Sequence, residues 1–96
     1  MINLELKELT QIKAIIAKHV PQAEVSFFGS RAKNTAQKHS DIDILIKDKT
    51  KIPLNTLSLL KADFEDSNIP FRVDVLDYYR TSLEFIKNIS SELVTV

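Results

Sequence analysis

The sequence predicts a single α/β domain over residues 1–96, in which a small mixed β-sheet is flanked by helices. Two observations predict this fold class. Segments with apolar residues at helical spacing are interspersed with short segments in which every second residue is apolar. The hydrophobic fraction of 44% and the charged fraction of 27% are typical of a soluble folded domain. The expected order is helix, strand, turn, strand, helix, strand, helix, which indicates helices packed on a small sheet.

The first two helices are expected at residues 4–20 and 53–67. Apolar residues recur every three or four positions in both segments, while charged and polar residues fill the positions between them. Asn3 is a suitable N-cap for the first helix, and Pro21 ends it. Pro53 suits the first turn of the second helix, where a backbone N–H group is not needed. Each helix therefore has one apolar face that is expected to pack on the sheet.

A last helix is expected to begin at residues 81–84. The sequence Thr-Ser-Leu-Glu has the form of a capping box, in which a hydroxyl and a carboxylate satisfy backbone N–H groups at the helix start. Leu83, Ile86 and Ile89 follow at helical spacing. We expect these three side chains to be buried.

Three segments are expected to form strands, at residues 25–28, 41–46 and 71–76. In the second of them, isoleucine occupies every other position, so Asp41 and Asp43 point together to the opposite face of the sheet. Two side chains at this spacing are about 6.6 Å apart along a strand. Because two carboxylates held this close repel each other, the site needs a group that offsets their charge.

A divalent cation is well suited to offset this charge. Mg²⁺ prefers oxygen ligands and typically takes one or two carboxylates together with substrate phosphates. Asp74 adds a third carboxylate on the third strand, whereas strand parity places Asp77 on the other face. If the two strands are neighbours, Asp41, Asp43 and Asp74 can converge on a pair of metal ions about 3.5–4 Å apart.

A phosphate-binding turn is predicted where the first strand ends. Gly29 is the only glycine in the chain, and its position before Ser30 indicates a tight turn or the close approach of a ligand. Ser30 offers a hydroxyl and a backbone N–H, and a helical turn starting there would favour negative charge. Arg31 is the best candidate for a further phosphate contact among the basic residues nearby. Phosphates beside metal ions are typical of phosphoryl-group chemistry.

These segments together resemble a known family. The sequence at residues 29–34, Gly-Ser-Arg-Ala-Lys-Asn, and the sequence at residues 40–44, Ser-Asp-Ile-Asp-Ile, are similar to the signature of the DNA polymerase β-like nucleotidyltransferase superfamily. The similarity is greatest to its minimal nucleotidyltransferase branch, whose third-aspartate strand resembles residues 70–75. The resemblance covers nearly the whole chain and implies a fold like the polymerase β palm. Asn34 stands where the family usually has glycine.

The resemblance implies a role for each site residue. Asp41 and Asp43 would bind Mg²⁺, with two ions expected, and Asp74 would complete the site and help to deprotonate the acceptor hydroxyl. Gly29 and Ser30 would hold the triphosphate of ATP or another nucleoside triphosphate. The α-phosphate would then be attacked, and pyrophosphate would leave.

Charge and length restrict the other partners. Thirteen basic residues balance thirteen acidic ones, so no overall positive field attracts long nucleic acid. The chain is too short for a second domain that holds a template, and template-directed synthesis is not expected. There is no apolar run of the roughly 20 residues that a membrane span needs, and no secretion signal, so a cytoplasmic protein is expected. Acceptor recognition must come from a second polypeptide or from self-association.

The resemblance also implies a partner. Minimal nucleotidyltransferases often pair with a helical HEPN-domain protein in toxin–antitoxin systems, where the nucleotidyltransferase is the antitoxin and transfers AMP to a tyrosine of the HEPN ribonuclease. Protein adenylylation is therefore the leading hypothesis. A binding module that neutralises its partner without catalysis is one alternative. Nucleotide transfer to a small molecule, such as an aminoglycoside, is another.

Overall fold

The predicted fold class is confirmed by the structure, a computed structural model that describes residues 4–29 and 41–96. Four strands form one mixed sheet in the order β3-β2-β1-β4, in which only the β2–β3 pair is parallel. The elements are α1 (Leu6–His19), β1 (Glu24–Phe28), β2 (Ile42–Lys47), α2 (Leu54–Asp66), β3 (Val73–Asp77), the 3₁₀ turn η1 (Tyr78–Arg80), α3 (Leu83–Ile89), the 3₁₀ turn η2 (Ser90–Glu92) and β4 (Val94–Thr95).

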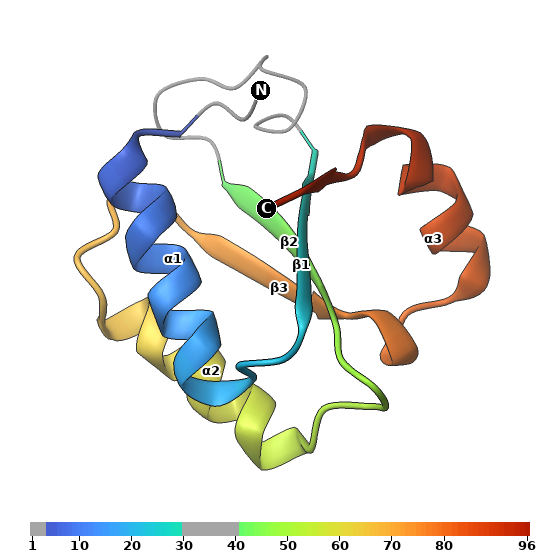
Figure 1. The fold of residues 1–96 in the computed structure, drawn as a ribbon, viewed down its shortest axis with the longest axis horizontal. Helices are drawn as coiled ribbons and strands as arrows, with labels where there is room; N and C mark the ends of the chain where they lie inside the picture. Colours follow the sequence, from blue (N-terminus) through green and yellow to red (C-terminus); the bar gives the residue numbers. More distant parts are fainter. Residues whose placement is uncertain (1–3, 30–40) are drawn as a thin grey trace.

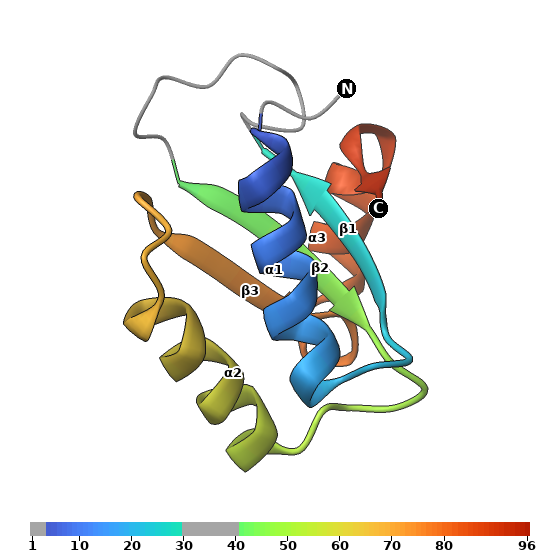
Figure 2. The same ribbon diagram turned by 60° about the vertical axis from the view of Figure 1, so that its left-hand side comes forward.

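The helices lie on both faces of the sheet. Helices α1 and α2 lie side by side on one face, and α3 lies on the other side of the molecule (Figures 1 and 2). The main core lies under α1 and α2, where Ile12 and Leu60 are fully buried against Phe27 and Ile44 of the sheet. Because side chains of a strand alternate between faces, this packing sends every second residue of β1, β2 and β3 to the α3 side.

The α3 face carries a much smaller core. Phe28, Leu45 and Ile89 are buried there, and Leu76 packs against them. Helix α3 has only seven residues, so it covers a limited part of this face. The residues of β2 and β3 that α3 leaves partly exposed include the aspartates singled out in the sequence.

All three helix starts differ by one or two residues from the sequence-based expectation, and α2 begins at Leu54 with Pro53 as its N-cap instead of in its first turn. Helix α1 begins at Leu6 with Glu5 as its N-cap, and the side chains of Glu5 and Glu8 cap each other's backbone N–H groups. The proposed cap Asn3 lies outside the described residues. Helix α3 begins one residue later than a cap at the first position of the motif would give, because Ser82 accepts the hydrogen bond from the Phe85 N–H.

The expectation that Leu83 is buried was wrong. Its side chain is 71% exposed, whereas Ile89 is buried and Ile86 is partly buried. Leu83 is the first residue of the seven-residue helix α3, whose buried residue, Ile89, is at the other end. The strand β4 was not expected from the sequence at all. It has two residues, which is too short for an alternating pattern to stand out.

Asp77 has a structural role, in agreement with its predicted side of β3. Its side chain is almost fully buried and accepts hydrogen bonds from the backbone N–H of Ile52 at 2.8 Å and of Tyr79 at 3.1 Å. The Arg80 guanidinium lies 3.3 Å from the same carboxylate and also donates to the Ile52 carbonyl. Asp77 therefore fixes the loop before α2 to the end of β3. None of the helices in the described part of the chain has the length and hydrophobicity of a membrane span.

Candidate active site

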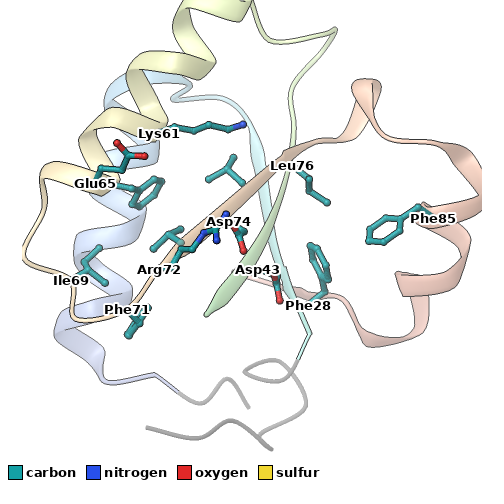
Figure 3. A pocket seen from close by; sticks show the side chains of 13 residues that line it. Phe28, Asp43, Lys61, Glu65, Ile69, Phe71, Arg72, Asp74, Leu76 and Phe85 are labelled. Carbon is teal, nitrogen blue, oxygen red and sulfur yellow. Dashed lines mark ion pairs between the residues drawn. The ribbon is translucent and has the colours of Figure 1, made fainter. Parts of the chain in front are cut away.

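Asp43 and Asp74 lie side by side on the α3 face of the sheet. They are direct partners in the parallel register of β2 and β3, so their backbones are about 4.8 Å apart. Both side chains are partly exposed and point into the same space (Figure 3). The alternation that buries the isoleucines of β2 and the valines of β3 under α1 and α2 forces these two aspartates to the other face.

Asp41 lies two residues before Asp43 along the chain, and its charge acts on Asp43. It directly precedes β2 and is exposed, and the adjacent Ile42 N–H donates to the Arg72 carbonyl at 2.9 Å, which joins the starts of the two strands. Arg72 also places its Nε 3.0 Å from Oδ1 of Asp74. Within residues 4–29 and 41–96, no three acidic or histidine side chains are gathered closely enough to hold a metal ion in this arrangement.

The electrostatics of the site fit a divalent cation. Burial raises the pKa of Asp43, and the negative charges of Asp74, Asp41 and Glu92 raise it further, in that order. Four carboxylates therefore act on the same small region, and ionised Asp43 is disfavoured there unless positive charge is added. Oxygen ligands on neighbouring strands, with excess negative charge, are the donor set that Mg²⁺ prefers.

Gly29 lies directly against Asp43 at the end of β1. Its backbone φ is +80°, a conformation that residues with a side chain rarely adopt. A Cβ atom at this position would overlap with Oδ2 of Asp43. The Gly29 N–H donates to Oε1 of Glu92 at 3.1 Å. The glycine is therefore needed twice, for the backbone turn and for its close approach to the carboxylate.

The remaining predicted phosphate-binding residues, Ser30 and Arg31, lie outside the described residues, as does Asn34. The structure thus brings together Gly29, Asp43 and Asp74 and places Asp41 at their edge.

A cleft of about 790 Å³ surrounds the two aspartates and extends over both sides of β3. Figure 3 shows aromatic and aliphatic side chains on its α3 side and mixed charged and apolar side chains on its α2 side. Phe28 and Phe85 pack edge to face on the α3 side, with ring centroids 6.1 Å apart. The labelled lining residues are Phe28, Asp43, Lys61, Glu65, Ile69, Phe71, Arg72, Asp74, Leu76 and Phe85.

Sequence reasoning missed two charged residues of the site. Arg72 has a local signal, because it lies two residues before Asp74 on the same strand and therefore faces the same way. Glu92 has no such signal, since 63 positions separate it from Gly29 and only the folded chain brings them together.

Comparisons with known proteins identify the family of the chain. The family described as "Polymerase beta, Nucleotidyltransferase" matches residues 10–96. The Haemophilus influenzae protein named "Probable protein adenylyltransferase MntA" is 35% identical over 95 residues, which covers 99% of this chain and 83% of that protein.

Solved structures share the fold. A chain in the crystal structure of a toxin–antitoxin with AMP-PNP has a TM-score of 0.75 at 18% identity, covering 96% of this chain and 72% of that one. The structure of a minimal nucleotidyltransferase has a TM-score of 0.73 at 22% identity and is covered over 97% of both chains. With its paired strand aspartates, its glycine turn and a match over most of its length, the chain belongs to the polymerase beta nucleotidyltransferase family and is a nucleotidyltransferase.

Proposed function

We propose that this protein is a Mg²⁺-dependent adenylyltransferase that moves AMP from ATP to a hydroxyl group on a HEPN-type toxin and thereby acts as its antitoxin. The observation that supports the proposal most directly is the in-register pairing of Asp43 with Asp74, with Gly29 packed against Asp43. This arrangement puts a candidate phosphate-binding turn beside a candidate metal site. Adenylyl transfer requires both at the same place.

In this proposal, Asp41, Asp43 and Asp74 hold two Mg²⁺ ions. When bound, the ions would neutralise phosphate charge and polarise the α-phosphate and the attacking oxygen. The ion pair between Arg72 and Asp74 would open as the carboxylate takes up this role. The exposed position of Asp41 and the partial exposure of Asp74 leave both accessible to an incoming ligand.

The protein's own groups would then position the reactants. The Gly29 N–H, Ser30 and Arg31 would hold the triphosphate, and Asp74 would accept the proton of the acceptor hydroxyl. The acceptor oxygen forms a bond to the α-phosphorus, the bond between the α-phosphorus and its bridging oxygen to the β-phosphate breaks, and pyrophosphate leaves. Such catalysis depends mainly on positioning and charge stabilisation.

The relatives support a protein acceptor. One is named a protein adenylyltransferase, and two matching crystal structures are of the toxin–antitoxin pair MntA-HpeT with substitutions. We propose that the acceptor hydroxyl, on a tyrosine, is brought by the toxin in a hetero-oligomer.

The proposal is tested by incubating the protein with α-labelled ATP, Mg²⁺ and the HEPN-type protein encoded next to it. Label is expected on the partner, and it should disappear in the double variant Asp41→Asn, Asp43→Asn. Asp66→Asn is the matched control, because it removes an exposed carboxylate at the end of α2 and should leave labelling unchanged.

The outcomes separate the alternatives. Neutralisation of the toxin by the double variant at full strength, with no label on the partner, would show a binding module instead of a transferase for that partner. Label on an added aminoglycoside in the absence of any partner protein would indicate transfer to a small molecule.

A further inference from the structure

The side chain of Glu92 contacts the backbone N–H of Gly29. Its Oε1 accepts a hydrogen bond of 3.1 Å from the Gly29 N–H, and its side chain is partly buried. Glu92 ends the turn η2 and precedes β4, so it reaches the site from the opposite end of the chain. An anionic oxygen on a backbone N–H of a turn with positive φ is also how such turns hold phosphate oxygens.

If the proposed function is correct, two anions compete for the Gly29 N–H: the Glu92 carboxylate and a phosphate group of the nucleotide. A backbone N–H makes one good hydrogen bond, so the carboxylate that now accepts from the Gly29 N–H and a phosphate oxygen cannot both hold it well. We propose that Glu92 is a built-in competitor of the triphosphate: its carboxylate occupies the phosphate position on Gly29 in the nucleotide-free protein and sets the affinity for the nucleotide.

The charge of Glu92 also supports the proposal that it competes with the triphosphate. It contributes to the raised pKa of Asp43, so the carboxylate acts electrostatically on the proposed metal ligand as well as on Gly29. A triphosphate that arrives with Mg²⁺ would therefore displace a group that repels it.

Strand β4 anchors the chain that follows Glu92. The backbone after Glu92 is fixed to β1 by the pairs Ser26–Thr95 and Phe27–Val94. The Val96 N–H also donates to the Val25 carbonyl at 3.0 Å. With its backbone fixed in this way, Glu92 remains close to Gly29 after displacement and can return when the product leaves.

The loss of nucleotide affinity depends on the fraction of molecules in which Glu92 does not occupy the Gly29 N–H. A ligand that binds only the free form loses affinity in proportion to that fraction. A charge-assisted hydrogen bond that holds Glu92 on Gly29 in roughly nine molecules of ten weakens nucleotide binding about tenfold. A purely structural Glu92, which only orders the turn, would have the opposite effect when removed.

The unique glycine makes the contact directly observable. Untagged protein labelled with ¹⁵N-glycine gives a single amide signal, that of Gly29, because the chain has one glycine. The amide proton should lie downfield in the wild type, move upfield in Glu92→Gln and move further in Glu92→Ala. Titration with ATP and Mg²⁺, without any acceptor, then gives the dissociation constant from the same signal.

The matched control is Glu24→Gln, which removes the same charge at the opposite, exposed end of β1. We expect the dissociation constant for ATP to fall about tenfold in Glu92→Ala, to fall less in Glu92→Gln and to stay unchanged in Glu24→Gln. An equal or weaker affinity in both Glu92 variants would overturn the proposal. A Gly29 signal that ATP does not move in any variant would overturn it too, because the donor would not be shared. The labelling of the partner protein by the wild type reports separately on the proposed function.

Discussion

Asp43 is partly buried and lies in a local excess of negative charge, and both features raise the pKa of its carboxyl group. Burial raises its pKa most, followed by the charges of Asp74, Asp41 and Glu92. A carboxylate with a raised pKa destabilises the fold at pH values above that pKa, where it has to be ionised, and this penalty disappears as the pH falls through it. The metal-free protein therefore carries a built-in destabilisation at neutral pH.

The first prediction concerns the removal of this charge. Asp43→Asn should raise the melting temperature of the metal-free protein at pH 7 by a few degrees, because solvent screening limits the gain to less than about 1 kcal/mol. The same variant should lose nucleotide transfer. Thermal melts without metal between pH 4 and pH 7 check this, and the gap to the wild type should close towards acid pH.

Asp66→Asn serves as the control for these melts. Its carboxylate is exposed at the end of α2, and we expect no comparable pH-dependent gain. A lower melting temperature for Asp43→Asn than for the wild type at pH 7 would contradict the electrostatic account of the site.

Gly29 allows a second prediction at the same scale. Gly29→Ala should destabilise the protein by about 2 kcal/mol or more, since alanine is strained at φ +80° and its Cβ would overlap with Asp43. Urea unfolding measures the loss.

A double-mutant cycle separates the two causes. In Asp43→Ala the overlapping carboxylate is absent, so Gly29→Ala should be less harmful in that background, and only the backbone strain should remain. An identical loss in both backgrounds would show that the close approach to Asp43 is unimportant for stability.

At the scale of elements, α1 and α2 are joined by a small charged cluster. His19 Nε2 lies 2.5 Å from Oδ2 of Asp63, and Lys18 Nζ lies 3.3 Å from the same atom. The hydrogen bond from His19, and then that from Lys18, lower the pKa of Asp63. The two helices that cover the main core are thereby tied together at one end.

The third prediction tests this connection. Asp63→Asn should lower the midpoint of urea unfolding at pH 7. Because the pKa of Asp63 is lowered in the folded state, its contribution is complete above the unfolded-state pKa and is lost as the pH falls through the folded-state value. The difference between wild type and variant should therefore shrink between pH 5 and strongly acid pH, within the range where aspartates titrate.

Salt provides the control for this cluster. Because the Lys18–Asp63 ion pair lies at the surface, high ionic strength should reduce the difference between Asp63→Asn and the wild type. A difference that stays constant with both pH and salt would show that Asp63 contributes by packing instead of charge.

The sequence predicted the elements well where the pattern is local. Alternation along β2 and β3 gave the correct face for Asp43 and Asp74, because two successive residues of a strand must point in opposite directions. The burial of Leu83 was predicted wrongly, because the first position of α3 depends on which hydroxyl caps the helix and on how the helix meets the sheet.

Contacts between distant segments were beyond sequence reasoning. The pairing of β4 with β1 and the hydrogen bond from Gly29 to Glu92 join residues more than 60 positions apart. The register that puts Asp43 opposite Asp74 could be stated only as a condition, since the spacing of residues within each strand does not determine how two strands pair. These non-local contacts decide which charges reach the site.

For the whole molecule, ligand binding should appear as an increase in the free energy of unfolding and in the melting temperature. A domain of this size buries a small core and has a thin stability margin, so a ligand that binds only the folded state changes its melting temperature clearly. At a free concentration of about 100 times the dissociation constant, the gain is about 2.7 kcal/mol. Any relief of repulsion among the site carboxylates is part of this gain, because it is already contained in the dissociation constant.

The fourth prediction follows from this linkage. ATP with Mg²⁺ should raise the melting temperature of the wild type by roughly 10 °C or more near saturation. The double variant Asp41→Asn, Asp43→Asn should show little of this rise, and ATP with EDTA should show little in either protein. An equal rise in both proteins with Mg²⁺ would mean that the nucleotide binds elsewhere.

Strand β3 has one further consequence, which concerns solubility. It is an outer strand of the sheet, and its free side is a template on which a strand of another molecule can pair. The charges of Arg72 and Asp74 at this margin oppose such pairing, as charged residues on outer strands generally do. We therefore expect the candidate catalytic aspartate also to oppose aggregation. Replacing it with an apolar residue would reduce soluble yield as well as activity, so Asp74→Asn and Asp74→Val should be compared at equal concentrations of monomeric protein.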